Sequence, residues 1–222
     1  MRKSFTLPLV AVILCLIGSS PVFALSMSKE TRERLERDRT MTTEKATVIE
    51  NLQHAFNGES NASAKYAVYA AKAKADGYVA VAALFNAASA AEKLHAERHA
   101  AVLKREGVEA KAEIGEYAGK DIAEMLKDAI AGETEEFTEM YPGFIQTAEA
   151  VGFTQAVRSF KGAMEAEKVH AQLYTEALND LENWKAEKAF FVCPVCGWTE
   201  VGEASESCPI CGAPGAKFGE FR

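Results

Sequence analysis

The sequence predicts a mainly α-helical protein: a four-helix bundle with one long crossover, followed by a small metal-binding ribbon. Three observations predict this fold class. A segment of about 75 residues occurs twice, and both copies carry apolar residues at helical spacing. A long non-periodic stretch joins the two copies, and four of the five cysteines lie near the C-terminus. Two short connections around one long one give a bundle with a single crossover.

Residues 1–24 have the layout of a secretory signal peptide. Arg2 and Lys3 precede an apolar run, and Val22-Phe23-Ala24 fits a small-residue cleavage site. A retained N-terminal anchor is the alternative, which we favour less because the apolar run is short for a bilayer span. We therefore expect an exported, periplasmic protein with no stable membrane span after cleavage.

Residues 25–43 form a dense run of charges, which we interpret as a solvated tail or a short exposed helix. The whole chain carries a formal net charge of −7. Because nucleic acids are polyanions, this balance disfavours them as partners.

Each copy of the duplication predicts two helices joined by a tight turn. The first copy gives helices over 44–75 and 78–106, and the second gives helices over 120–150 and 153–182. These segments are rich in Ala, Glu, Lys and Leu, which favour helix. The turns contain Gly77 and Gly152, and the crossover runs from about residue 106 to residue 119.

A repeated hexapeptide carries the strongest functional signal. Residues 91–96 read AEKLHA and residues 166–171 read AEKVHA, so each copy places Glu and His three apart on one helix face. Each copy also has one Glu at a matching position of its other helix. This is the ligand pattern of two-metal carboxylate bundles, and such ligands suit iron or manganese. The predicted ligands are Glu59, Glu92, His95, Glu133, Glu167 and His170.

A single Glu-x-x-His on a helix is usually a solvated surface pair, but two at equivalent points of a duplication favour a site. His54 and His99 have no counterpart in the other copy. We interpret both as ordinary surface or packing residues.

The second copy differs from the first near its leading Glu. It has one more residue between Glu133 and Tyr141 than the first has between Glu59 and Tyr66. An inserted residue is commonly absorbed as a π-bulge, often at a functional site. Glu136, three residues after Glu133, is a predicted seventh or alternate ligand, whereas we expect Glu135 to be an exposed acid.

The C-terminal segment contains a second small duplication, CPVCG and CPICG. Two C-x2-C pairs predict a tetrathiolate site for zinc or iron, made by Cys193, Cys196, Cys208 and Cys211. Spacing alone favours a structural zinc ribbon, but a turning-over two-metal site needs an electron source, which favours iron. The glycine after each pair permits positive φ, so that backbone N–H groups can turn toward sulfur.

With these motifs, the chain resembles the rubrerythrin family over roughly residues 44–222. The resemblance implies a ferritin-like di-iron domain over 44–182, a linker over 183–188 and a rubredoxin-like domain over 189–222. It implies iron in both sites, with Glu136 among the bundle ligands. Tyr66 and Tyr141 match tyrosines that flank the di-iron site in the family.

The resemblance also implies an activity, which is the reduction of hydrogen peroxide by homodimers supplied by an electron-donor protein or a reductase. The expected catalytic residues are Glu136, His95, Tyr66 and Tyr141, with Glu136 and His95 trading places as ligands when the oxidation state changes. The alternative is an iron-binding or storage protein with ferroxidase activity and a structural zinc ribbon.

Overall fold

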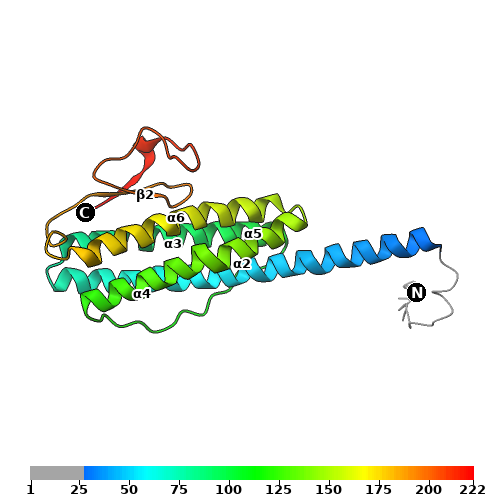
Figure 1. The fold of residues 1–222 in the computed structure, drawn as a ribbon, viewed down its shortest axis with the longest axis horizontal. Helices are drawn as coiled ribbons and strands as arrows, with labels where there is room; N and C mark the ends of the chain where they lie inside the picture. Colours follow the sequence, from blue (N-terminus) through cyan, green and yellow to red (C-terminus); the bar gives the residue numbers. More distant parts are fainter. Residues whose placement is uncertain (1–27) are drawn as a thin grey trace, which may run out of the picture. The chain divides into compact units, whose positions relative to one another are not determined.

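The structure is a computed structural model that describes residues 28–222 (Figure 1). The expected signal peptide, residues 1–24, lies outside the described residues. The described residues fall into two units, residues 28–40 and residues 41–222. The helical elements are α2 (Lys29–Ala75), α3 (Val79–Arg105), α4 (Ile122–Glu135), the π-helix η1 (Glu136–Met140), α5 (Tyr141–Ala150) and α6 (Thr154–Asn179).

The first helix begins earlier than the sequence predicts, at Lys29 rather than near residue 44. Its first residues are exposed and strongly charged, and they include an i,i+4 pair in which Lys29 Nζ lies 3.8 Å from Glu33 Oε1. Straight-chain charged residues have good helix propensity, and opposite charges four apart add a little support. The charged segment is therefore helical and exposed from Lys29 on.

Within residues 41–222, the four long helical segments lie side by side, with η1 and α5 continuing the line of α4 (Figure 1). Two buried apolar clusters fill the bundle, one toward each end. The first is built around Tyr66, Phe85 and Tyr174, and the second around Tyr141 and Phe160. The functional residues lie between these two clusters.

The π-helix confirms the expectation drawn from the inserted residue. It spans Glu136–Met140, within the one-residue-longer stretch of the second copy. Pro142 follows at the start of α5, where its missing N–H costs least. The extra residue widens one turn, and the bundle helix continues beyond it.

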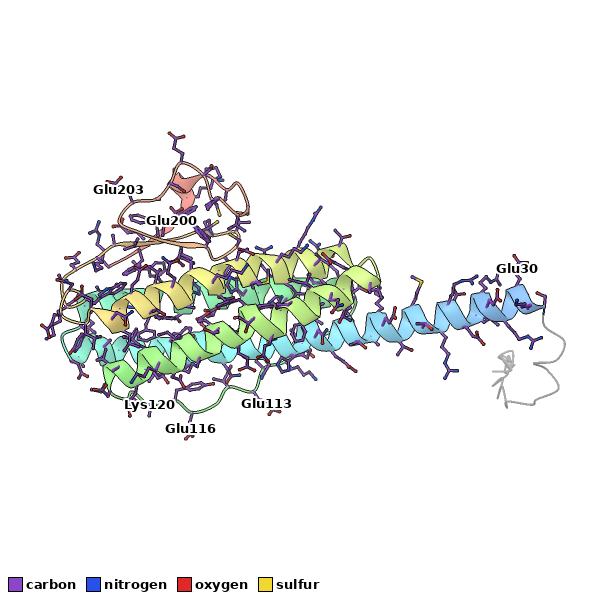
Figure 2. All side chains as sticks on the ribbon, viewed as in Figure 1. Glu30, Glu113, Glu116, Lys120, Glu200 and Glu203 are labelled. Carbon is purple, nitrogen blue, oxygen red and sulfur yellow. The ribbon has the colours of Figure 1, made fainter. Side chains whose placement is uncertain are left out.

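The crossover between α3 and α4 is held in an extended conformation by amide side chains of α2. Gln53 pairs with both backbone groups of Lys111, and Asn57 Oδ1 accepts from Glu113 N at 2.9 Å. Asn61 donates to Glu113 O and accepts from Gly115 N, each at 2.9 Å. Figure 2 shows the labelled side chains of Glu113 and Glu116 pointing away from the helices.

The C-terminal ribbon is a three-stranded antiparallel sheet in the order β2-β1-β3. Its strands are β1 (Phe190–Val192), β2 (Thr199–Val201) and β3 (Gly219–Phe221), with a short 3-10 helix η2 (Gly215–Lys217) before β3. The sheet packs on α3 and α6, and Phe190 stacks on Trp184 with ring centroids 5.9 Å apart. No helix among residues 28–222 combines the length and the apolar content that crossing a membrane requires.

Candidate metal centres

The structure brings the six repeated ligands together at the middle of the bundle. Each long helical segment contributes, since Glu59 comes from α2, Glu133 from α4, and a Glu-x-x-His pair from each of α3 and α6. All six side chains are buried, none with more than 1 % of its surface exposed. The helical spacing explains this convergence, because residues three apart project from the same face.

The six residues form two overlapping groups of potential ligand atoms. One group is Glu59, Glu92, His95 and Glu167, and the other is Glu92, Glu133, Glu167 and His170. Within each group the ligand atoms lie within 4.8 Å of one another. Glu92 and Glu167 belong to both groups, so they can bridge two ions while the other four residues each serve one.

The imidazoles point their Nδ1 atoms into the carboxylate cluster. His95 Nδ1 lies 3.0 Å from both Glu92 Oε2 and Glu167 Oε1. His170 Nδ1 lies 3.1 Å from Glu167 Oε2 and 3.3 Å from Glu92 Oε1. The arrangement is nearly two-fold symmetric, as the duplication predicts.

Unsatisfied carboxylate oxygens test whether these residues fit metal ions. One oxygen on each of Glu59, Glu92, Glu133 and Glu167 is buried without a well-formed hydrogen bond in the described part of the chain. Those of Glu92 and Glu167 still face an imidazole Nδ1, at 3.3 Å and 3.0 Å. Leaving a buried charge unpaired costs several kcal/mol, so native proteins rarely do so without a cation. Two divalent cations would balance four ionised carboxylates, and the donor set therefore fits two such ions.

The electrostatics of the metal-free cluster point the same way. Burial and the neighbouring charge of Glu92 hold the pKa values of Glu59 and Glu133 well above the usual carboxyl range. Burial alone would lower the pKa of His95, but the charges and hydrogen bonds of Glu167 and Glu92 together outweigh it and raise that pKa to about 10. Without an ion, Glu59, Glu133 and His95 therefore tend to hold protons. Metal binding must displace these protons.

Glu136 lies at the start of η1 and stands outside both groups of ligand atoms. Its side chain is half-buried, and burial followed by the charge of Glu133 raises its pKa well above the usual range. Glu136 therefore lies close enough for the charges of the cluster to raise its pKa, but its carboxylate does not lie among the ligand atoms of the six repeated residues. Glu135 is exposed, as expected.

Tyr66 and Tyr141 hydrogen bond to the outer side of the cluster, each across the bundle. Tyr66 donates to Glu133 Oε1 at 2.7 Å, and Tyr141 donates to Glu59 Oε1. Each tyrosine is buried, and burial followed by the facing carboxylate raises its pKa well above 10. Both hydroxyls thus stay protonated and orient a ligand carboxylate.

His54 is exposed against Phe144, and His99 packs against Tyr141 and Phe160, so both are surface or packing residues as interpreted. His99 also makes two hydrogen bonds, which the sequence interpretation missed. His99 is fully buried, with Nε2 3.1 Å from the Tyr141 hydroxyl and Nδ1 2.8 Å from Ser159 Oγ. Burial, and then the charge of His95, lowers its pKa to about 3, so the ring is neutral. The sequence did contain a signal for this role of His99, because the equivalent position in the second copy holds Tyr174 rather than histidine.

The four late cysteines form the second centre, with free thiols. Cys193 Sγ lies 3.5 Å from Cys211 Sγ, and Cys196 Sγ lies 3.5 Å from Cys208 Sγ, which is too far for a disulfide. Gly197 and Gly212 have φ of 77° and 75°, which closes each turn. Backbone N–H groups of Ile210 and Cys211 bond to the sulfur of Cys208, offset its burial and lower its pKa.

The first cysteine turn docks on the ligand histidines of the bundle. His95 Nε2 lies 3.0 Å from Cys196 O, and His170 Nε2 lies 3.0 Å from Thr199 Oγ1. Thr199 donates its own proton to Gly197 O, so it accepts from His170. A methyl group on Gly197 would overlap His95 Nε2, so glycine also permits this close approach.

The comparisons with known proteins agree with this architecture. The rubrerythrin family model matches residues 50–178, and the model of the rubrerythrin rubredoxin-like domain matches residues 191–219. The chain belongs to the rubrerythrin family. It is 34% identical to rubrerythrin-2 of Clostridium acetobutylicum over 184 residues, which cover 82% of this chain and 100% of that protein.

Nigerythrin of Nitratidesulfovibrio vulgaris is 38% identical over 173 residues, which cover 78% of this chain and 85% of that protein. A solved structure of fully reduced, all-ferrous nigerythrin has a TM-score of 0.74 at 36% identity, covering 78% of this chain and 86% of the other. The carboxylate di-iron site and the rubredoxin-like four-cysteine cluster of the rubrerythrin family are both present, in a form consistent with iron.

Proposed function

We propose that this rubrerythrin-family protein is a peroxidase that reduces hydrogen peroxide to water, with electrons relayed by its rubredoxin-like iron. One observation carries the proposal: Cys196 offers its sulfur to the four-cysteine site and its carbonyl oxygen to His95 at 3.0 Å. A storage protein has no use for such a contact, whereas a reductive enzyme needs it.

The residues of the bundle would hold and balance the di-iron centre. That centre, when bound, supplies two electrons to hydrogen peroxide, which takes up two protons and leaves as two waters. Glu92 and Glu167 would bridge the ions, and their burial excludes bulk water from the site. Tyr66 and Tyr141 would fix the orientation of the terminal carboxylates.

Glu136 and His95 are the proposed oxidation-state-sensitive ligands. A further carboxylate beside the ions would stabilise the two positive charges that their oxidation would add. Glu136 lies in the widened turn beside Glu133, where a π-helix leaves side chains room to move. His95, neutral when bound to a metal, suits the reduced state.

The physiological setting is also part of the proposal. The N-terminal sequence supports export and cleavage after Ala24, and the family supports homodimers supplied by an electron-donor protein or a reductase. Intact mass of protein from its native host tests cleavage, since a chain that still begins at Met1 contradicts export with processing.

The test of the peroxidase is Cys208→Ser in the iron-loaded full-length protein. The variant should keep bundle iron and a single oxidation by peroxide after chemical reduction, because the bundle ligands are untouched. Steady turnover with an external reductant should fall to near background. Unchanged turnover would show that electrons bypass the ribbon.

A visible spectrum of the wild-type protein addresses the storage alternative. Iron held by four thiolates absorbs visible light and bleaches on reduction, whereas zinc is silent. Zinc in this site, together with iron retained by the bundle without turnover, would favour storage with ferroxidase activity.

A further inference from the structure

A chain of hydrogen bonds leads from the protein surface to Glu59 in one half of the bundle. Ser159 Oγ on α6 lies 2.8 Å from His99 Nδ1. His99 Nε2 lies 3.1 Å from the Tyr141 hydroxyl, which bonds to Glu59 Oε1. All four side chains are buried, and Ser159, the outermost, is 4% exposed.

The direction of each bond follows from the number of protons available. Tyr141 donates its only hydroxyl proton to Glu59, so its oxygen accepts from His99. His99 therefore carries its proton on Nε2, and Nδ1 of the neutral ring accepts from the Ser159 hydroxyl. All three donors thus point from the surface toward the metal ligand.

The outer end of the chain opens on a surface pocket of about 250 Å³. Ser159 lines this pocket together with Arg98, Arg105 and Arg158. Guanidinium groups do not give up protons in proteins, so the arginines are not the proton source. The pocket is large enough for several waters, which can donate to Ser159.

The other half of the bundle lacks this chain. By the 75-residue offset, Ser159 corresponds to Leu84 and His99 corresponds to Tyr174. Tyr66 still donates to Glu133, but the Tyr174 hydroxyl has no hydrogen-bond partner among residues 28–222. The bundle core thus packs with Leu and Tyr at these places, and packing alone does not explain Ser159 and His99.

We propose that Ser159, His99 and Tyr141 form the path by which protons reach the bundle centre. The proposal rests on the proposed peroxidase function, because reducing hydrogen peroxide to two waters consumes two protons. Glu59 suits the inner end, since Oε1 faces Tyr141 while Oε2 has no hydrogen-bond partner in the described residues and is free for an ion.

Each passage balances in protons and moves no electrons. A pocket water gives a proton to Ser159 Oγ as the serine gives its own to His99 Nδ1, and the hydroxide left in the pocket takes up a proton from bulk solvent. The Nε2 proton moves to Tyr141, and the Tyr141 proton moves to Glu59 Oε1. The imidazole is left with its proton on Nδ1, and rotation of the ring, together with reorientation of the Ser159 and Tyr141 hydroxyls, presents an N–H to Tyr141 again.

The first test uses Ser159→Ala in the iron-loaded, reduced, full-length protein, with Ser159→Thr retaining the hydroxyl. Oxidation by peroxide should slow about tenfold in Ser159→Ala, with a larger solvent isotope effect, at unchanged iron content. Ser159→Thr should keep the wild-type rate. Tyr174→Phe, at the equivalent of His99, is the matched control and should change nothing.

A second readout does not depend on activity. In the zinc-loaded full-length protein with ¹⁵N-labelled histidine, exchange of the His99 Nε2–H with solvent should slow about tenfold in Ser159→Ala. A wild-type exchange rate, or a wild-type oxidation rate, in this variant overturns the path. If the wild-type protein is itself not oxidised by peroxide, the peroxidase proposal fails, and the exchange measurement alone decides the path.

Discussion

The two metal centres are built in opposite ways. The bundle centre gathers ligands from four helical segments far apart in sequence and buries them completely. The ribbon centre takes its four cysteines from two short turns, and Cys211 is exposed. The bundle centre therefore depends on the whole fold and excludes solvent, whereas the ribbon centre depends on local turns and remains open to a donor.

The two centres meet where Cys196 O lies 3.0 Å from His95 Nε2, and the largest effect is expected there. Gly197→Ala and Gly212→Ala place the same methyl group at φ of 77° and 75°, in the two matching turns. Both should lose about 1–2 kcal/mol of stability from the left-handed backbone. Only Gly197→Ala also pushes a methyl group into His95, so steady peroxide turnover should fall strongly in that variant alone.

Turnover assays and visible spectra of both variants check this expectation. The four-cysteine iron should remain in both, since no cysteine changes. Equal turnover in the two variants would mean that the contact between Cys196 and His95 does not matter for electron supply.

A smaller effect on turnover is expected inside the bundle. The six repeated residues would hold the metal ions there, whereas Glu136 stands outside both ligand groups. Glu136→Ala should keep close to two irons per site, because Glu136 lies outside both ligand groups, but oxidation by peroxide should slow about tenfold. His95→Ala removes a repeated ligand and should lose iron as well. Iron analysis beside stopped-flow oxidation separates the two, and wild-type behaviour of Glu136→Ala would make it an ordinary acid.

The smallest and most gradual effect is that of pH on the metal-free bundle. Burial and the charge of Glu92 raise the folded pKa of Glu133 to about 8. Burial lowers the folded pKa of His95, but Glu167 and Glu92 together raise it to about 10. A raised folded pKa means that the folded state holds extra protons. Its stabilisation is complete below the unfolded pKa and is lost as pH rises through the folded value.

Chemical denaturation of the metal-free protein should therefore show stability declining from about pH 5 to pH 9. Loading with zinc should reverse the trend, because metal binding releases these protons and strengthens as pH rises. The Glu133→Gln variant is the control and should flatten part of the decline. A metal-free protein that gains stability over this range would contradict the charge assignment.

Much of both centres could be predicted from the sequence because the signals are local or periodic. The Glu-x-x-His spacing fixes a helix face, and the inserted residue before Tyr141 fixes the place of the π-helix. Each cysteine turn closes within five residues, so the conformation of each C-x2-C pair follows from the local sequence.

The remaining features depend on tertiary contacts that no period encodes. His99 meets Ser159 across 60 residues of chain, and the docking of Cys196 on His95 spans 101 residues. A signal existed for the first, since comparing His99 with Tyr174 exposes a polar substitution in a repeated core. The helix α2 begins at Lys29, well before its first buried residue, Val48. Helix propensity alone therefore extends it beyond the part that packs in the bundle.

The amide side chains of α2 that bond to the crossover also affect how the protein can associate with other molecules. An extended segment with free backbone groups can pair with another chain and seed aggregation. In the crossover, Gln53, Asn57 and Asn61 already occupy the backbone groups of alternate residues from Lys111 to Gly115. The helix thus closes one edge of this segment with side chains, and a neighbouring molecule cannot add a strand there.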